Sequence, residues 1–269
     1  MKINKKIGLA LGSGGPRGLA HIGVIKALKE NDIPIDIIAG SSAGALIGGL
    51  FASLGSIKKV EEIAKQLTYK DLVSVFSEMG ASSGIFKGDK IESYLNNILK
   101  NKNIESLNIP FVAVATDINT GESVNISSGN LAKAIRASSS IPTLVSATNL
   151  NGKYLVDGGA SNPVPVHIAK TLGADITIAV NLDVYNYIDT SFPLKRIGVR
   201  DMGVAALKML RSNLSNELCK EADITITPDV ANVSSINIVR FVHGDSIIEA
   251  GYEAAKNSIP KIKKILKNM

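Results

Sequence analysis

Tryptophan is missing from this chain of 269 residues, and all aromatic residues together make up only 4% of it. Proteins that bind nucleic acid commonly stack bases on aromatic rings or gather basic residues into one stripe. Here the net charge is +6, and the basic residues are spread along the whole chain. We therefore do not expect nucleic acid as a partner.

Cysteine and histidine are almost as scarce, with one cysteine, Cys219, and three histidines far apart in the sequence. A single cysteine excludes an internal disulfide bond, and the histidines lack the spacing of metal ligands. A chain without disulfides fits a reducing compartment, so the predicted location is the cytoplasm. We expect chemistry that uses no metal and no other cofactor.

Charged residues are absent from residues 37–57, a stretch long enough to suggest a transmembrane helix. Glycine and serine recur through it, however, and Pro34 and Asp36 stand just before it. A buried strand, a tight turn and a closely packed helix explain the same composition, and we prefer that interpretation. With 45% hydrophobic residues the chain can bury one sizeable core, so we predict a single domain over residues 1–269.

The order of the predicted elements indicates the fold class. Buried strands are predicted at residues 6–11 and 35–39, and each is followed by a glycine-rich turn and a helix, at residues 19–31 and 45–54. Strands that alternate with helices form parallel sheets with helices on their faces. We therefore predict a three-layer α/β/α fold with a mostly parallel central sheet.

The second half of the chain adds further strands and helices. Asn151-Gly152 predicts a two-residue hairpin turn between two short strands. A long helix is predicted over residues 202–220, followed by a strand and two closing helices. Residues 68–90 and 183–200 show no clear period, and we expect these irregular segments to shape a substrate pocket.

A five-residue motif, Gly40-Ser41-Ser42-Ala43-Gly44, lies between the second predicted strand and its helix. The pattern Gly-x-Ser-x-Gly is typical of the nucleophile elbow, a strained turn that lifts a serine hydroxyl above the edge of a sheet. Gly40 and Gly44 are the small residues that this turn needs on either side of Ser42, so Ser42 is the candidate nucleophile. The N-terminus of the following helix favours negative charge that develops nearby.

A glycine-rich loop follows the first predicted strand and reads Gly12-Ser13-Gly14-Gly15-Pro16-Arg17-Gly18. Loops of this kind expose backbone N–H groups to an anion. A phosphate loop of the Walker type is excluded because no Gly-Lys-Ser/Thr ending follows. A dinucleotide loop built on Gly12, Gly14 and Gly18 is an alternative, but no acidic residue ends the second strand to hold a ribose.

The third interpretation of this loop is an oxyanion hole, which we prefer. Gly14 and Gly15 would direct their N–H groups toward the crevice at the strand ends that holds Ser42, and Arg17 would add a third donor. Pro16 has no N–H and contributes none. In this interpretation the remaining glycines of the loop support its conformation.

Asp157-Gly158-Gly159 follows the predicted hairpin and offers a carboxylate as a base for Ser42. The two glycines let the backbone bend close to a neighbouring loop. A carboxylate with an ordinary pKa near ~3.9 is a poor base for a hydroxyl, so burial has to raise its pKa. His167, further along the chain, is a rival base that would complete a triad.

Together and in this order, the motifs resemble the patatin-like phospholipases, notably their compact bacterial members. The resemblance covers nearly the whole chain and rests on the glycine-rich loop, residues 19–24, the elbow, residues 137–142 and the Asp-Gly-Gly motif. It implies the patatin-like fold and a lipid acyl hydrolase with a Ser-Asp dyad, in which Ser42 is the nucleophile and Asp157 the base. The implied substrates are phospholipids, lysophospholipids or other esters. Ser13 replaces the first of three consecutive glycines in plant members, but the two donors that follow remain.

Two alternatives stay open. Residues 260–269 carry four lysines among apolar residues, so this segment is either a helix that rests on anionic lipid at the inner membrane face or, as we prefer, a solvated surface helix. The other alternative is a catalytically idle protein of the same fold that binds lipid or has a regulatory role. The presence of all the motif residues favours the enzyme.

Overall fold

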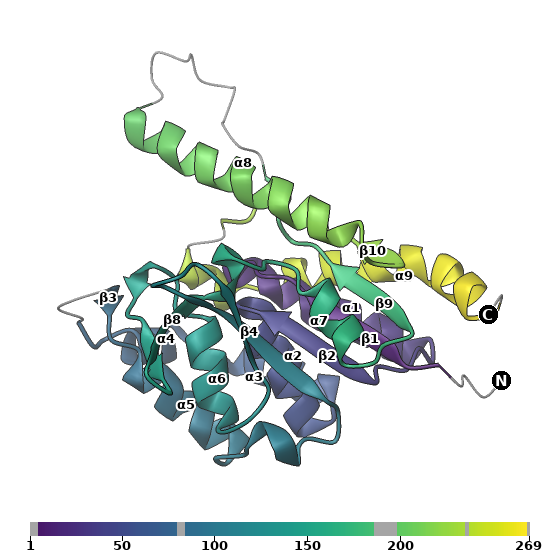
Figure 1. The fold of residues 1–269 in the computed structure, drawn as a ribbon, viewed down its shortest axis with the longest axis horizontal. Helices are drawn as coiled ribbons and strands as arrows, with labels where there is room; N and C mark the ends of the chain where they lie inside the picture. The colour runs from purple at the N-terminus through teal and green to yellow at the C-terminus, as the bar shows by residue number, and fades with distance from the viewer. Residues whose placement is uncertain (1–4, 80–83, 186–197, 235–236, 268–269) are drawn as a thin grey trace.

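The computed structural model describes residues 5–79, 84–185, 198–234 and 237–267 (Figure 1). Its strands are β1 (Ile7–Leu11), β2 (Ile37–Ser41), β3 (Gly84–Phe86), β4 (Phe111–Asp117), β5 (Ser123–Ile126), β6 (Thr143–Val145), β7 (Thr148–Leu150), β8 (Lys153–Asp157), β9 (Ile176–Val180) and β10 (Ile224–Ile226). Its α-helices are α1 (Ala20–Glu30), α2 (Ala43–Leu54), α3 (Ile57–Gln66), α4 (Tyr69–Val75), α5 (Asp89–Leu99), α6 (Leu131–Ser138), α7 (Val166–Thr171), α8 (Val199–Cys219) and α9 (Asp245–Lys267). Strand and helix alternate at the start of the chain, as the sequence predicts.

Eight of the described strands form the central sheet, in the order β10-β9-β1-β2-β4-β8-β7 with β5 also paired to β4. The five strands from β10 to β4 run parallel, while β8 and β5 are antiparallel to β4. The predicted α/β fold with a mostly parallel central sheet is therefore confirmed. β3 and β6 form a separate two-stranded sheet.

Alternate residues of the strands face two different layers of helices. Leu9 and Leu11 of β1 belong to the larger core, which also contains residues of α1, α2, α6 and α9. Ala10, between them, packs on the other face with Val166 of α7 and Cys219 at the end of α8. The end of α8 joins this second layer, and its first half projects beyond the rest of the described chain (Figure 1).

The charge-free stretch at residues 37–57 corresponds to β2, the turn after it and α2. β2 lies inside the parallel sheet between β1 and β4, and α2 packs against the same three strands. Its lack of charge thus follows from burial inside the protein. Within the described residues, none of the helices is long and apolar enough to cross a membrane.

The end of the chain differs from the prediction of two closing helices. A short 3₁₀ turn at Ile238–Phe241 precedes one long α-helix, α9, which contains Pro260. Proline lacks an N–H and commonly ends a helix. Here the apolar residues on both sides, Ile259 and Ile262, are buried in the core and continue the helix past the proline.

Two segments predicted to be irregular also contain regular structure. Residues 68–90 include α4, which begins at a capping box on Thr68, and the short strand β3. The predicted segment 183–200 is described only in part, because residues 186–197 lie outside the described residues. α8 begins at Val199, a few residues before the predicted start.

Candidate active site

Ser42 occupies the turn between β2 and α2 and has a positive φ, with φ 55° and ψ −118°. Residues other than glycine rarely adopt such angles, and holding one there costs on the order of 1–3 kcal/mol. A Cβ on Gly40 would lie 2.5 Å from the carbonyl oxygen of Gly44, and a Cβ on Gly44 would overlap the carbonyl oxygen of Leu11. The strained turn is therefore possible only with small residues at both positions, as the motif predicts.

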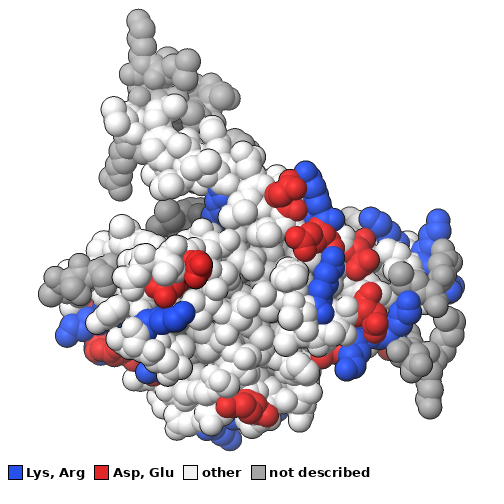
Figure 2. All heavy atoms as spheres, viewed as in Figure 1, with Lys and Arg blue, Asp and Glu red and all other residues white. Residues whose placement is uncertain are grey.

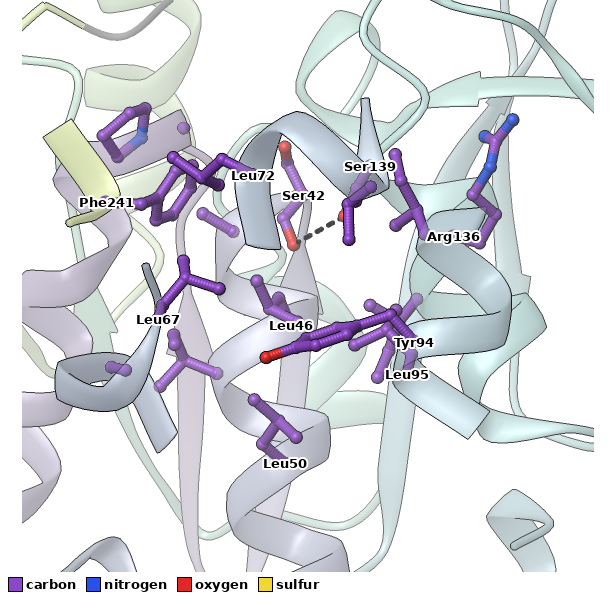
Figure 3. A pocket seen from close by; sticks show the side chains of 18 of the residues that line it. Ser42, Leu46, Leu50, Leu67, Leu72, Tyr94, Leu95, Arg136, Ser139 and Phe241 are labelled. Atoms are coloured by element: carbon purple, nitrogen blue, oxygen red, sulfur yellow. Dashed lines mark hydrogen bonds between the residues drawn. The ribbon is translucent and has the colours of Figure 1, made fainter. Parts of the chain in front are cut away.

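The end of α6 holds the backbone of Ser42. The N–H of Ser42 donates to Oγ of Ser138 at 2.9 Å, and the Ser138 hydroxyl donates to the carbonyl oxygen of Val114 at 2.5 Å. The hydroxyl of Ser139 donates to the carbonyl oxygen of Ser42 at 3.4 Å (Figure 3). The serines of segment 137–142 thus fix the position of the elbow.

The register of the sheet brings Asp157 to Ser42. Ser41 of β2 is paired with Val114 of β4, and the next residue of β4 is paired with Asp157 at the end of β8. The Ser42 hydroxyl donates a hydrogen bond to Oδ2 of Asp157, and the N–H of Gly159 donates to Oδ1 at 2.7 Å. Two motifs that are separate in the sequence therefore form one hydrogen-bonded pair.

Burial is the largest influence on the Asp157 carboxyl group, and it raises the pKa of that group. The nearby charge of Arg211 and the hydrogen bonds from Ser42 and Gly159 lower this pKa, but the net shift is upward. A carboxylate with a raised pKa is a stronger base toward a hydroxyl proton. The shift has the direction that a carboxylate base requires.

The glycine-rich loop lies between β1 and α1 and passes beside Ser42. The N–H groups of Gly12 and Ser13 donate to carbonyl oxygens of neighbouring segments. Gly14 and Gly15 then open a 3₁₀ helix, and the first N–H groups of such a helix have no partner within it. Because Gly15 lines the same cavity as Ser42, these donors lie near the place where an oxyanion would form.

Glycines in all three motifs let them approach one another. A Cβ on Gly18 of the loop would overlap the Cβ of Ala43, the residue after the candidate nucleophile. A Cβ on Gly158 would lie 2.6 Å from the Oγ of Ser41. The loop, the elbow and the Asp-Gly-Gly motif therefore pack backbone against backbone.

The side chain of Arg17 is fully buried and contacts the segment after β9 through a hydrogen bond and an ion pair. Its guanidinium donates to the carbonyl oxygen of Val184 at 3.0 Å and forms an ion pair with Asp183 at 3.4 Å. It also lies over the ring of Tyr185, 4.2 Å from the ring centroid. Since the guanidinium is engaged there, only the backbone N–H of Arg17 remains a candidate oxyanion donor.

Arg211 reaches the same cluster from α8. Its guanidinium donates to Oδ2 of Asp183 at 3.0 Å and to the hydroxyl of Ser13, and its charge acts on Asp157. The hydroxyl of Ser215, one turn further along α8, donates to Asp183 at 2.6 Å. Asp183 thus forms ion pairs with both arginines and connects α8 to the glycine-rich loop.

The rival base, His167, stands apart from this cluster. It is exposed on α7, where its Nε2 lies 3.5 Å from the hydroxyl of Thr171. His21 is buried in α1 and donates from Nε2 to a loop carbonyl oxygen at 2.7 Å, and burial lowers its pKa to about 4. In the described structure neither ring is hydrogen-bonded to Ser42 or Asp157, which favours the Ser-Asp pair over a triad.

An apolar cavity of about 190 Å³ opens beside Ser42. Figure 3 shows Leu46 and Leu50 on α2 along its length, Tyr94 of α5 on one side and Phe241 on the other. The polar atoms of Ser42 stand at one end of it (Figure 3). The site therefore consists of a hydroxyl–carboxylate pair at one end of an apolar cavity.

The described part of segment 68–90 forms part of the cavity wall, in agreement with the prediction from the sequence. Leu72 and Val75 of α4 and the adjacent Phe76 line the cavity. Arg136 fixes the neighbouring chain, because its buried guanidinium donates to the carbonyl oxygens of Gly88 at 3.0 Å and Ser146 at 2.9 Å. This side of the cavity is thus held by backbone hydrogen bonds as well as by apolar contacts.

Residues 9–170 match a family model described as patatin-like phospholipase. The chain belongs to the patatin-like phospholipase family. The match includes the glycine-rich loop, the elbow and the Asp-Gly-Gly motif, and it confirms the resemblance derived from those motifs.

The relatives of this patatin-like chain are longer proteins. The uncharacterized NTE family protein Rv1063c of Mycobacterium tuberculosis is 42% identical over 178 residues, which are 66% of this chain and 49% of the relative. Patatin-like phospholipase domain-containing protein 7 of Rattus norvegicus is 36% identical over 197 residues, 68% of this chain and 14% of that protein. The chain thus spans about half the length of the mycobacterial relative.

A solved structure, VipD from Legionella pneumophila, aligns with 96% of this chain and 67% of its own, with a TM-score of 0.52 and 16% identity. At that identity the likeness concerns the fold alone. It extends well beyond the patatin-like match and includes the part of the chain that carries α8 and α9.

The sequence does not predict two charged residues near the candidate base, Asp183 and Arg211. Both lie beyond the residues that match the patatin-like family model. Asp183 carries one usable signal, because it follows the end of a buried parallel strand, where functional side chains gather. Arg211 carries none, because an arginine in a long helix is normally solvated. Only the packing of α8 reveals it.

Proposed function

We propose that this chain hydrolyses carboxylic esters of lipids, as a phospholipase A or a lysophospholipase, through an acyl intermediate on Ser42. The observation that carries the proposal is the hydrogen bond from the Ser42 hydroxyl to the buried carboxylate of Asp157 at the head of an apolar cavity. Membership of the patatin-like phospholipase family supports a lipid as the substrate.

In the first half of the reaction the Ser42 oxygen attacks the ester carbonyl carbon while Asp157 takes the hydroxyl proton. The carbonyl electron pair moves onto its oxygen, where the N–H groups of Gly14 and Gly15 stabilise the negative charge. The tetrahedral intermediate then breaks the bond to the alkoxy oxygen. The alcohol leaves with the proton held by Asp157, and the acyl group stays on Ser42.

In the second half water replaces the alcohol. The oxygen of the water molecule attacks the acyl carbon while Asp157 takes a proton from that water. The oxyanion forms again at the same N–H groups. Collapse of this intermediate breaks the bond to Ser42, whose oxygen recovers the proton from Asp157. The fatty acid is released and the enzyme returns to its starting state.

The cavity supports an acyl chain as the group bound beside Ser42. Its lining is almost wholly apolar, with leucine and isoleucine side chains from α2, α3, α4 and α5. Such walls stabilise a hydrocarbon chain by removing it from water, at roughly 0.8 kcal/mol for each buried methylene. They offer few partners to a charged head group, which we therefore place outside the cavity.

A fluorophosphonate probe tests the nucleophile directly. We expect covalent labelling of the native protein and none of Ser42→Ala. On a short-chain ester, Asp157→Asn should lower turnover by roughly 10²- to 10⁴-fold because the base is lost. His167→Ala is the matched control and should retain activity.

Two results would contradict the proposal. If His167→Ala abolishes turnover while Asp157→Asn does not, the base has been assigned wrongly. If the native protein is not labelled and turns over no ester, the chain is instead a lipid-binding or regulatory protein of the same fold.

A further inference from the structure

The first half of α8 exposes an apolar face to solvent. Val199 is 92% exposed, Leu207 68% and Leu210 67%, and Met202 and Met209 are exposed as well. A set of large apolar side chains gathered in this way on a soluble surface marks a contact site for a partner. Isolated exposed apolar residues would need no such explanation.

The face points away from the protein. Successive residues of a helix turn by about 100°, so Val199, Met202 and Leu210 fall on one side of α8. Ser212 and Cys219, which are buried against the body, fall on the opposite side. A surface helix of a globular protein normally buries its apolar side and exposes its polar side. α8 does the reverse.

The apolar face is confined to the part of α8 that projects from the body (Figure 1). The exposed residues of the last two turns, which lie closer to the body, are polar or charged, such as Asn213, Asn216 and Glu217. The change occurs along a single continuous helix. The apolar character is therefore a local property of the projecting half.

The charged side chains described on this half lie off the apolar face. Asp201 and Lys208 fall on the side of α8 opposite Val199 and Leu210, and Arg211 is paired with Asp183. In Figure 2 the described atoms of the projecting half are white apart from a basic side chain near its base, while many charged side chains gather over β10 and α9. A face that carries none of these charges can enter the apolar part of a bilayer surface without burying an ion.

α8 also connects this face to the candidate active site. Arg211, directly after Leu210, enters the cluster formed with Asp183 and Ser13 of the glycine-rich loop. A partner that binds the apolar face is thus held close to the residues that surround Asp157. For an enzyme that acts on lipid, the partner that benefits from this position is the layer that contains the substrate.

A second copy of this chain is the competing occupant. Pairing of two such helices as a coiled coil needs an apolar seam sustained over roughly three to four heptads. Here the seam ends after residues 199–210. Its length suits the shallow insertion of an interfacial helix, whose apolar side lies about 5–10 Å deep in a bilayer surface.

We propose that the apolar face of α8, formed by Val199, Met202, Leu207, Met209 and Leu210, docks this chain onto the surface of a lipid bilayer. The choice of a lipid layer rests on the proposed function, whereas the docking itself does not require Ser42 to be a nucleophile.

Vesicle flotation tests the proposal, with the full chain carrying Ser42→Ala so that lipid is not consumed. The vesicles contain phosphatidylcholine with or without phosphatidylglycerol. We expect binding to both kinds of vesicle, because the contact is apolar, and Leu207→Ser with Leu210→Ser should weaken it by at least about tenfold, because apolar area leaves the bilayer. The matched control, Ile118→Ser with Tyr154→Ser, removes two exposed side chains, one directly after β4 and one on β8, and should bind like the parent.

A second pair, Val199→Ser with Met202→Ser, should reproduce the loss, and thermal unfolding should show that every variant is folded. The proposal is overturned if the parent does not bind vesicles or if both α8 pairs bind as tightly as the parent. It is also overturned if sedimentation shows a dimer that the α8 pairs convert to monomer while vesicle binding is unchanged.

Turnover of a soluble short-chain ester separates this proposal from the proposed function. When Ser42 is left intact, both double variants of α8 should hydrolyse the soluble ester as fast as the native chain. A native chain that binds vesicles through α8 but hydrolyses no ester supports docking and contradicts the hydrolase. A chain that hydrolyses the soluble ester but does not bind vesicles supports the hydrolase and contradicts docking.

Discussion

The two long helices α8 and α9 use their apolar residues in opposite ways. α9 buries Ile259 and Ile262 in the core and leaves its lysines in solvent. α8 exposes Leu207 and Leu210 and turns Arg211 inward to a buried carboxylate. Both helices combine apolar and basic residues, so composition alone does not separate them.

The difference shows what an apolar helix face does and does not reveal. It indicates that one side of the helix is more stable away from water, but not whether the protein's own core supplies that environment. For α9 the core does so, and the helix serves the fold. For α8 the core does not, and the exposed face is left for a partner. The lysine-rich end of α9 matches the sequence pattern of a helix that rests on a membrane. Its apolar residues, however, pack against the protein's own core.

The largest expected difference between the two helices is in stability. Ile262→Ala removes a fully buried side chain and should lower the free energy of unfolding by about 2–5 kcal/mol. Leu207→Ala truncates an exposed side chain and should change it by no more than about 0.5 kcal/mol. Urea denaturation measures both. Equal losses would mean that the outward face of α8 is buried in solution, which would break the comparison.

A smaller difference is expected in catalysis. Arg211→Met removes the positive charge near Asp157 and a donor to Ser13, so kcat on a soluble ester should fall roughly 10- to 100-fold with little change in KM. Arg211→Lys should recover part of the rate because it restores the charge. Lys256→Met on α9 is the control and should have no effect, since that side chain is exposed.

The pH profile distinguishes a role of Arg211 in setting the pKa of Asp157 from a purely structural role. Asp157 must be ionised to accept the proton, and burial raises its pKa, so the rate should rise with pH through a limb above the ordinary carboxylate value of ~3.9. Because Arg211 lowers this pKa, Arg211→Met should move the limb to higher pH. A lower kcat with an unmoved limb would assign Arg211 a purely structural role.

The smallest expected effect concerns the basic end of α9. If this end lay on a membrane, each lysine at an anionic surface would contribute about 1 kcal/mol to binding. We expect instead that Lys261→Ser with Lys264→Ser changes vesicle binding by less than about twofold, because the apolar residues between them face the core. A loss like that of the α8 pairs would return the membrane contact to α9.

The sequence predicts most of the fold because its first half repeats a simple pattern. Residues 6–11 and 35–39 are short apolar runs bounded by glycine turns, and they correspond to β1 and β2. The separate pair of β3 and β6 was missed, because three-residue strands carry too little pattern to be distinguished from loop. The continuous α9 was missed because Pro260 normally ends a helix, and tertiary packing overrides that preference here.

Prediction of the candidate site was limited by distance along the chain. Ser42, Asp157 and the glycine-rich loop carry local motifs whose glycines are required by the geometry, so residue order alone is informative. Arg211 has no motif. Its role depends on how α8 crosses the sheet and reaches Asp183, which no local pattern encodes.

The contacts of Asp183 with Arg17 and Arg211 have a consequence for how such proteins diverge. The recognisable motifs end before residue 170, but the charges that surround the base are completed by residues that follow. Motif and electrostatic setting are therefore separable parts of the chain. Two homologues with identical motifs can differ in the pH at which they work through their last third alone, and an exchange of that third would transfer the pH optimum without altering the nucleophile.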